Sequence, residues 1–155
     1  MAHIVFNVSK GRGVEFYYRV KNNDPANSAF ILVPLETSGL ESDAVLLDKD
    51  DLAAVLSGTT NEQATMGRKV LTDAELAAFP APDDTNDRYE VSLPSVVWAA
   101  ATGNAVRKIL VCFDRDTTVG TDADIIPVTL FDFTVTPSGV DITMIGGPFL
   151  RAATC

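Results

Sequence analysis

Apolar and polar residues alternate most regularly near the C-terminus. The alternation covers residues 131–136 and again residues 140–144, and a Pro-Ser-Gly segment, 137–139, separates the two runs. A period of two is typical of a strand with one buried face, and a short Pro/Gly segment between two such runs favours a hairpin. The pattern therefore predicts two antiparallel strands joined as a hairpin, with their large apolar side chains packed inward.

Shorter apolar runs predict further strands. Residues 30–35 form a compact apolar run of strand length, residues 89–93 alternate, and residues 96–98 form a third candidate, followed by a Thr-Gly-Asn turn signal at 102–104. Residues 108–113 are apolar on both faces. We therefore expect 108–113 to be a central strand that is covered on both sides.

Helical patterns are short and lie in the first half of the chain. Residues 11–23 carry apolar side chains at helical spacing and end before an Asp-Pro pair. Residues 48–57 form a second candidate helix with Asp48 as its N-cap. A capping-box pattern predicts a third short helix over 72–79, which Pro80 ends.

Together these segments predict a mainly β (α+β) fold. We expect one domain, 1–155, built as an antiparallel β-sandwich with two or three short helices in its N-terminal half. Strands concentrate in the second half, and the alternation of strand and helix that marks βαβ units is missing. No internal repeat or long linker divides the chain.

Composition agrees with a globular domain and limits the classes of partner. Of the 155 residues, 46% are hydrophobic and 21% are charged, so the chain can fold without disulfides or metals. The net charge of −9 argues against nucleic acid and against an anionic membrane surface as partners. Such a charge favours solubility, and it also suits a basic partner surface.

Two cysteines, Cys112 and Cys155, are too few for a disulfide framework, and a bridge to the terminal residue is not expected. The N-terminal residues lack the basic and apolar regions of a signal peptide. No window reaches the roughly 18–20 apolar residues that a membrane-spanning helix requires. We therefore expect a protein that is made in a cytoplasm and stays soluble.

The sequence carries no motif that indicates catalysis or a bound cofactor. The single histidine, His3, lies close to the terminus, where it is a poor candidate for the base of a nucleophilic triad. Cysteine and histidine do not occur at zinc-binding spacing. The Gly11–Gly13 pair lacks the rest of a phosphate-binding loop and is expected to be a turn at the entry to a helix. We therefore predict that the chain is not an enzyme and binds no cofactor.

Clusters of aspartate leave a metal site as a weaker hypothesis. Asp83, Asp84 and Asp87 share one loop whose carboxylates could hold Ca²⁺, although the spacing of an EF-hand is absent. The aspartates of residues 114–124 pose the same question. We expect both groups to be solvated acidic loops, so that no metal site is predicted.

Apolar residues near both termini are the candidates for an interface, because free termini are usually polar. Trp98 could also be an interface anchor, but an aromatic residue on a strand is more often part of the core. Six interface candidates follow from the terminal segments: Ile4, Val5, Phe6, Ile145, Phe149 and Leu150.

Seven segments spread over nearly the whole chain carry a resemblance to a known group of proteins. They are residues 15–25, 83–88, 98–104, 110–114, 126–127, 136–142 and 149–151. On these segments the chain resembles small structural proteins of tailed-bacteriophage virions. The shared residues are turns and strand ends, so the resemblance concerns the family more than a particular role.

The resemblance implies a role in the virus particle. It implies a capsid decoration (cement or minor capsid) protein that binds major capsid subunits, associates with itself as a trimer, and reaches the virion from the bacterial host cytoplasm. A neck or tail component is the nearest alternative. From the residues alone, a Ca²⁺-assisted glycan- or ligand-binding module and a carboxylate-dependent hydrolase also stay open.

Overall fold

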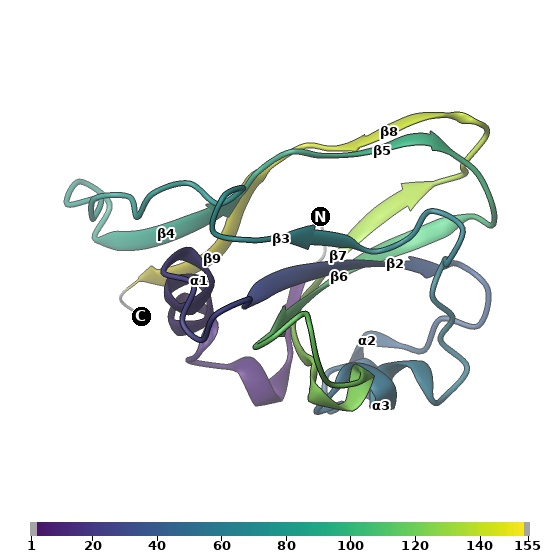
Figure 1. The fold of residues 1–155 in the computed structure, drawn as a ribbon, viewed down its shortest axis with the longest axis horizontal. Coiled ribbons are helices and arrows are strands. Elements are labelled where there is room, and N and C mark those ends of the chain that lie inside the picture. Colours follow the sequence, from purple (N-terminus) through teal and green to yellow (C-terminus); the bar gives the residue numbers. More distant parts are fainter. Residues whose placement is uncertain (1–2, 154–155) are drawn as a thin grey trace.

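A five-stranded antiparallel sheet forms the centre of the computed structural model, which describes residues 3–153 (Figure 1). Its two longest strands are adjacent, and each is paired on both sides. In spatial order the strands are β1 (His3–Val5), β7 (Ile126–Val135), β6 (Val106–Asp114), β2 (Ala29–Glu36) and β3 (Lys69–Leu71).

Two-stranded ribbons cover one face of this sheet, two short helices cover the other, and a longer helix lies at one end of the ribbon side (Figure 1). The mainly β sandwich with short helices is thereby confirmed. The ribbons pair β4 (Arg88–Leu93) with β9 (Gly147–Ala153), and β5 (Val96–Ala101) with β8 (Val140–Met144). The helices are α1 (Gly13–Lys21), α2 (Asp43–Leu46) and α3 (Leu52–Leu56), with two single 3-10 turns, η1 (Asn7–Ser9) and η2 (Asp122–Asp124).

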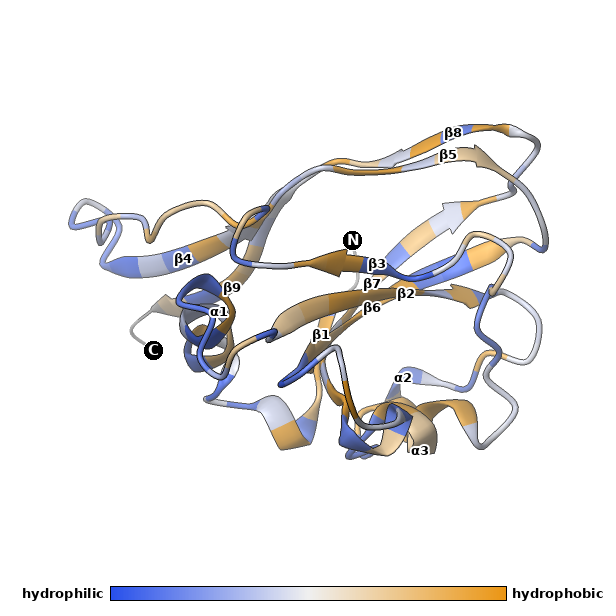
Figure 2. Ribbon diagram, viewed as in Figure 1, coloured by the Kyte–Doolittle hydropathy of each residue, from blue (hydrophilic) through white to orange (hydrophobic). Residues whose placement is uncertain are grey.

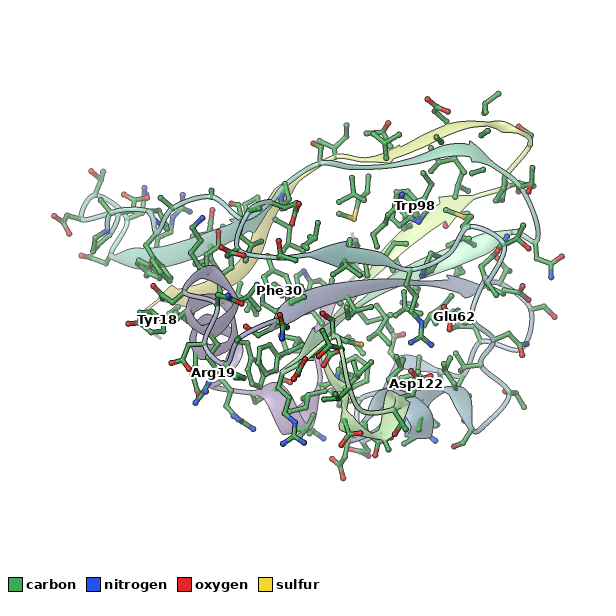
Figure 3. The ribbon with its side chains drawn as sticks, viewed as in Figure 1. Tyr18, Arg19, Phe30, Glu62, Trp98 and Asp122 are labelled. Atoms are coloured by element: carbon green, nitrogen blue, oxygen red, sulfur yellow. The ribbon has the colours of Figure 1, made fainter. Side chains whose placement is uncertain are left out.

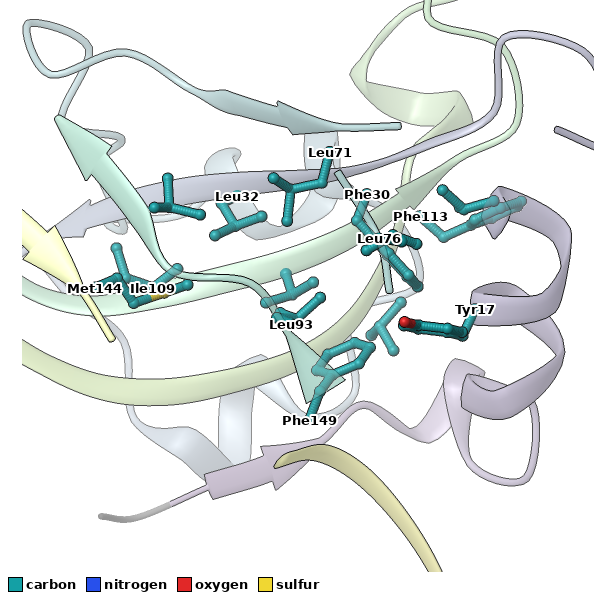
Figure 4. Close-up of a cluster of buried hydrophobic side chains, with 14 of the residues drawn as sticks. Tyr17, Phe30, Leu32, Leu71, Leu76, Leu93, Ile109, Phe113, Met144 and Phe149 are labelled. Carbon is teal, nitrogen blue, oxygen red and sulfur yellow. The ribbon is translucent and has the colours of Figure 1, made fainter. Parts of the chain in front are cut away.

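The larger core lies between the sheet and the ribbons, where large side chains from both layers interdigitate (Figure 4). Helix α1 closes one end of this core with its apolar side: the ring of Phe16 stacks on Phe113 of β6 with centroids 4.6 Å apart. The predicted helix at 11–23 is confirmed. Gly13 is the first residue of α1. A Cβ at this position would lie 2.3 Å from Leu150 Cδ1, so the absence of a side chain lets the helix approach β9.

A smaller core lies on the opposite face of the sheet, beneath α2 and α3. Leu46, Leu52 and Val55 of these helices are fully buried in the same cluster as Leu110 and Cys112 of β6. Strand β6 is therefore apolar on both faces, as predicted for a covered central strand, and the hydropathy colouring of β2 and β6 reflects this (Figure 2).

The two ribbons share one register and form a single long ribbon with a bend. Leu93 of β4 faces Gly147, and Val96, three residues further on, faces Met144, three residues earlier. The pairing therefore continues across the bend even though the ladder of hydrogen bonds is interrupted there. At the bend the Gly146 N–H donates to Ser95 Oγ at 2.9 Å, so that a side chain replaces the backbone acceptor.

An ion-pair cluster ties the segment before β3 to the turn before β7. Arg68 donates to Asp122 Oδ1 and to Glu62 Oε2, each at 2.6 Å; Figure 3 labels Glu62 and Asp122. The hydrogen bonds that Arg68 donates, first to Asp122 and second to Glu62, raise the pKa of Arg68. The bond from Arg68 also lowers the pKa of Asp122. The cluster thus joins two long connections that have no strand pairing with each other.

The buried side chain of Gln63 is hydrogen-bonded to the turn between β5 and β6. The side chain is 1% exposed, and its Nε2 donates to the carbonyl oxygens of Thr102 (3.0 Å) and Asn104 (3.1 Å). Between these two residues Gly103 adopts φ +108°, and a Cβ there would lie 2.1 Å from Gln63 Nε2. The predicted turn at 102–104 is confirmed, and it depends on a distant side chain.

Replacing Gln63 with alanine is expected to lower the free energy of unfolding by about 1–3 kcal/mol, because the buried Gln63 amide no longer donates to the carbonyl oxygens of Thr102 and Asn104. Urea denaturation measures the change as a lower midpoint with an unchanged slope. Asn61→Ala is the matched control, because its amide makes one exposed bond to Ser38 O at 3.2 Å. Equal midpoints for the two variants would contradict the role assigned to Gln63.

The predicted hairpin over 131–144 is wrong in its pairing, although both strands exist. β7 pairs with β1 and β6, whereas β8 pairs with β5. After Pro137 the chain leaves the sheet and joins the ribbon layer, and the Gly139 N–H donates to Ala101 O at 2.7 Å. The Pro-Ser-Gly segment is therefore a crossing between layers and not a hairpin turn.

The predicted helix at 72–79 is also wrong, because it stops after a single turn. Its capping bond is present, with the Thr72 N–H donating to Glu75 Oε2 at 2.7 Å. The Asp73 carbonyl, which a longer helix would bond to the Ala77 N–H, accepts instead from Lys21 Nζ of α1 at 2.8 Å, and Lys21 Nζ also binds Leu76 O at 2.8 Å. Contacts with α1 thus replace the helical bonds.

The helix predicted over 48–57 is confirmed in a shorter form, α3. Its N-cap is Asp51 and not Asp48: Asp51 Oδ1 accepts from the Ala54 N–H at 2.6 Å. Helix α2 and strand β3 were not predicted, because each is too short to show a period.

Candidate interaction groove

An apolar groove lies between the edge strand β1 and the bend of the ribbon. One part is a cavity of about 330 Å³ with apolar walls from β1, β7 and the ribbon, among them Leu93, Phe131 and Ile145. A second hollow continues along β1 and β9, and both parts are lined by His3, Pro148 and Phe149. We call the combined depression the β1–β9 groove.

The backbone of β1 presents unpaired groups toward the outer edge of the sheet. The Phe6 N–H donates to Val128 O at 3.0 Å, and the same antiparallel register places Ile4 opposite Leu130. Hydrogen bonding alternates along an antiparallel strand, so Ile4 and Phe6 bond to β7 while the backbone groups of His3 and Val5 point away from it. No other described strand pairs with this edge.

Strand β9 contributes its edge to the opposite side of the groove. Four consecutive residues, Pro148 to Arg151, line the second hollow. Side chains of a strand alternate between its faces, so four successive residues reach one depression only where the strand edge borders it. The described pairing of β9 is with β4, on its other side.

The structure brings together four of the six interface candidates and separates the other two. Val5, Ile145, Phe149 and Leu150 all line the groove, and Ile145 is 80% exposed. Ile4 and Phe6 point to the opposite face of the sheet, into or against the smaller core.

Two candidates are corrected by their burial. Phe6 is fully buried in the smaller core, so it offers no surface to a partner. Phe149 is 4% exposed, and its ring packs edge-on against Phe30 at 5.2 Å, so it forms the floor of the groove more than an exposed contact. Trp98 is 1% exposed and its Nε1 donates to Gly67 O at 2.9 Å, which confirms its place in the core.

His3 belongs to the groove, although the sequence drew attention to it only as a poor catalytic candidate. It shares a face of β1 with Val5, and this period of two is the signal that could have found it. Partial burial lowers the pKa of His3, which favours the neutral imidazole.

None of the described residues that line the groove is acidic, although the chain carries a net charge of −9. Its one cationic side chain, Arg151, is already paired: Nε donates to Glu90 Oε2 at 2.7 Å. With His3 neutral and Arg151 paired with Glu90, the groove is a mainly apolar surface whose one described cation is already bound. An exposed apolar depression of this kind is typical of a site where a protein or ligand binds.

In the Asp83–Asp87 loop, the carboxylate of Asp83 is bound by neighbouring side chains. Asp83 Oδ2 accepts from Asn86 Nδ2 at 2.8 Å and from Arg88 Nε at 3.0 Å. These bonds, with Asn86 first, lower the pKa of Asp83. Asp84 and Asp87 line a shallow depression beside Arg88, and nowhere between residues 3 and 153 do three His, Cys, Asp or Glu side chains gather as a metal site would require.

Calcium is therefore expected to leave the melting temperature unchanged. An ion that binds only the folded state would raise the melting temperature. We expect no such ion at Asp83, because its carboxylate is already paired with Arg88. Thermal unfolding in millimolar CaCl₂ and in EDTA makes the comparison, with Asp83→Asn as the variant that removes the carboxylate. A rise in calcium that Asp83→Asn abolishes would establish a site in this loop.

The second group of aspartates also has local partners. Asp116 Oδ1 accepts from the Thr118 N–H at 3.0 Å, Asp124 Oδ2 accepts from the Thr121 N–H at 2.8 Å, and Asp122 binds Arg68. Cys112 is buried in the smaller core, and burial raises the pKa of its thiol, so it is not a reactive nucleophile. Cys155 lies outside the described residues.

None of the helices in residues 3–153 combines the length and the apolar character needed to cross a membrane. Comparison with known proteins adds no relative to this picture: no family model matches the chain, and neither the curated proteins nor the solved structures contain a match.

Proposed function

We propose that this chain is a structural component of a bacteriophage particle, a capsid decoration protein that binds neighbouring subunits through the β1–β9 groove. The observation that carries the binding role is the mainly apolar groove, lined by no described acidic residue, on an otherwise acidic domain. The phage assignment is supported by the sequence resemblance described above.

The groove suits contact with another protein for two reasons. Its walls are apolar, and Ile145, which borders it, is 80% exposed, so covering the groove would remove apolar surface from water. Interface cores are depleted in charged residues, as this lining is. The net charge elsewhere on the chain favours solubility before assembly.

The rigidity of the two walls also supports a docking role. The bend of the ribbon is held by the Gly146–Ser95 bond, and β1 is paired along its inner side with β7. A groove between two paired elements keeps its shape without a partner, which lowers the entropy cost of binding.

Quantitative mass spectrometry of purified particles of the encoding phage tests the proposal. A decoration protein is expected in hundreds of copies per particle, whereas six or twelve copies would indicate a neck component. Absence from the particle would overturn the virion role altogether.

The groove is tested in the same particles with a matched pair of variants. Ile145→Asp places a charge at the groove and is expected to reduce incorporation strongly. Val119→Asp is the control, because Val119 is 67% exposed in the loop between β6 and β7, is not among the groove-lining residues, and should leave incorporation unchanged.

A further inference from the structure

We propose that the β1–β9 groove binds an extended apolar segment of a different polypeptide, which pairs as an added strand with the outer edge of β1. The inference rests on the proposed function only in taking the groove as the contact surface. It names the conformation and the chemistry of what occupies that surface.

Backbone hydrogen bonding determines the conformation of the occupant. His3 and Val5 together direct two N–H donors and two carbonyl acceptors away from β7. An extended chain is the partner that satisfies donors and acceptors at this alternate spacing, and strand addition to an open sheet edge is an established mode of peptide recognition. A helix or a small ligand would leave part of this set unpaired.

The two edges of the sheet differ in how they are protected against strand addition. The β3 edge carries Lys69 and follows directly after Arg68, and charged side chains at an edge discourage pairing with another chain. The β1 edge, His3–Val5, has no lysine, no proline and no acidic residue. Only the β1 edge therefore has the properties of a strand acceptor.

The lining determines the side chains of the occupant. An added strand would direct every second side chain toward the floor formed by Phe131 and Phe149, which requires apolar residues at those positions. Without a carboxylate in the lining, and with Arg151 already bound to Glu90, the groove provides no partner for a charged side chain. The occupant is therefore alternately apolar and uncharged where it enters the groove.

Charge and pairing favour a different polypeptide over a second copy of this chain. Each copy carries a net charge of −9, so two copies repel each other at close approach. A second copy could offer only an edge that is already part of its own fold, such as its own three-residue β1, and this alternative is what the light-scattering measurement below tests.

The test selects binders from a random twelve-residue peptide library displayed on the surface of filamentous phage, with the complete chain as the immobilised target. We expect the enriched peptides to have alternating apolar residues. Binding of a synthetic enriched peptide should protect the amide hydrogens of His3 and Val5 from exchange.

Val5→Pro is the diagnostic variant, because the Val5 N–H faces the groove and β7 does not use it. It removes one donor for the added strand and should weaken peptide binding about tenfold. Val5→Ala keeps the N–H and is the matched control. Ile145→Asp changes the groove without altering the backbone of β1, and it repeats the test if Val5→Pro lowers the melting temperature.

Three outcomes would overturn the inference. The first is that no peptide is enriched, and the second is that peptides bind Val5→Pro and Ile145→Asp as tightly as the unaltered chain. The third is self-association, measured by light scattering, that these variants abolish, because it would identify a second copy as the occupant. The peptide measurement uses no virus particle. If the chain binds peptides but is absent from virions, the proposed function is rejected and this inference stands. If the chain is present in virions but binds no peptide, the inference is rejected and the proposed function stands.

Discussion

Gly146→Ala is expected to lower the free energy of unfolding by about 3 kcal/mol. A Cβ at this position would lie 2.5 Å from Leu93 O and 2.6 Å from Ser95 N. Both are backbone atoms of the opposite strand, which pairing holds on either side of the bend, so no side-chain rotation relieves the contact. The ribbon would have to separate where its two strands approach most closely.

The neighbouring glycine provides the matched control. A Cβ on Gly147 would meet nothing within 4 Å, so Gly147→Ala is expected to change stability by less than about 1 kcal/mol. Urea denaturation of both variants, followed by circular dichroism, compares their midpoints. Equal midpoints for the two alanine variants would mean that the bend can open without cost, and that the groove wall is not rigid.

Trp98→Ala is expected to cost about 3–5 kcal/mol, the range for truncating a large buried aromatic side chain. Trp98 is 1% exposed and lies in the larger core between β5 and the sheet, where its ring approaches Phe133 with centroids 6.2 Å apart. The variant also leaves Gly67 O without its indole donor.

Circular dichroism must follow this unfolding, because Trp98 is the only tryptophan and its fluorescence disappears with it. Val97→Ala, on the same strand but 46% exposed, is the control and should stay within about 0.5 kcal/mol of the unaltered chain. Trp98→Phe separates packing from the hydrogen bond, since it keeps an aromatic ring. If Trp98→Ala lowers the free energy of unfolding no more than Val97→Ala does, the assignment of Trp98 to the core is contradicted.

Local patterns predicted most strands because burial sets the spacing of apolar residues along each one. The run at 108–113 is apolar on both faces, and β6 is covered by the ribbons on one side and by α2 and α3 on the other. The alternation at 131–136 and 140–144 correctly marked β7 and β8. Such patterns report which side of a strand is buried, and they carry no information about its neighbour.

Pairing and helix length could not be predicted, because distant residues decide them. The bond from Gly139 to Ala101 O directs β8 toward β5, which lies far earlier in the sequence. At 72–76 the capping bond forms as expected, but Lys21 of α1 takes the carbonyl groups that would extend the helix. In both places a local signal was satisfied and the tertiary contact determined the outcome.

The groove was predictable only in part. Apolar residues near both termini marked its two walls, and Val5 and Ile145 do line it. The sequence could not reveal which face of β1 packs on the smaller core, because helices far along the chain cover that face. Phe6 lies on that face, whereas His3, which was not among the candidates, lines the groove.

The bent ribbon also constrains the order in which the chain can fold. Its two strands flank β6, the following loop and β7, so its pairs join distant parts of the sequence. Pairing of Val106 with Val135 brings the ends of β5 and β8 close together and shortens the loop that the ribbon must close. We therefore expect β6 and β7 to pair before the ribbon zips from Ala101 toward Arg88, so that the groove, completed by β9, is among the last features to form.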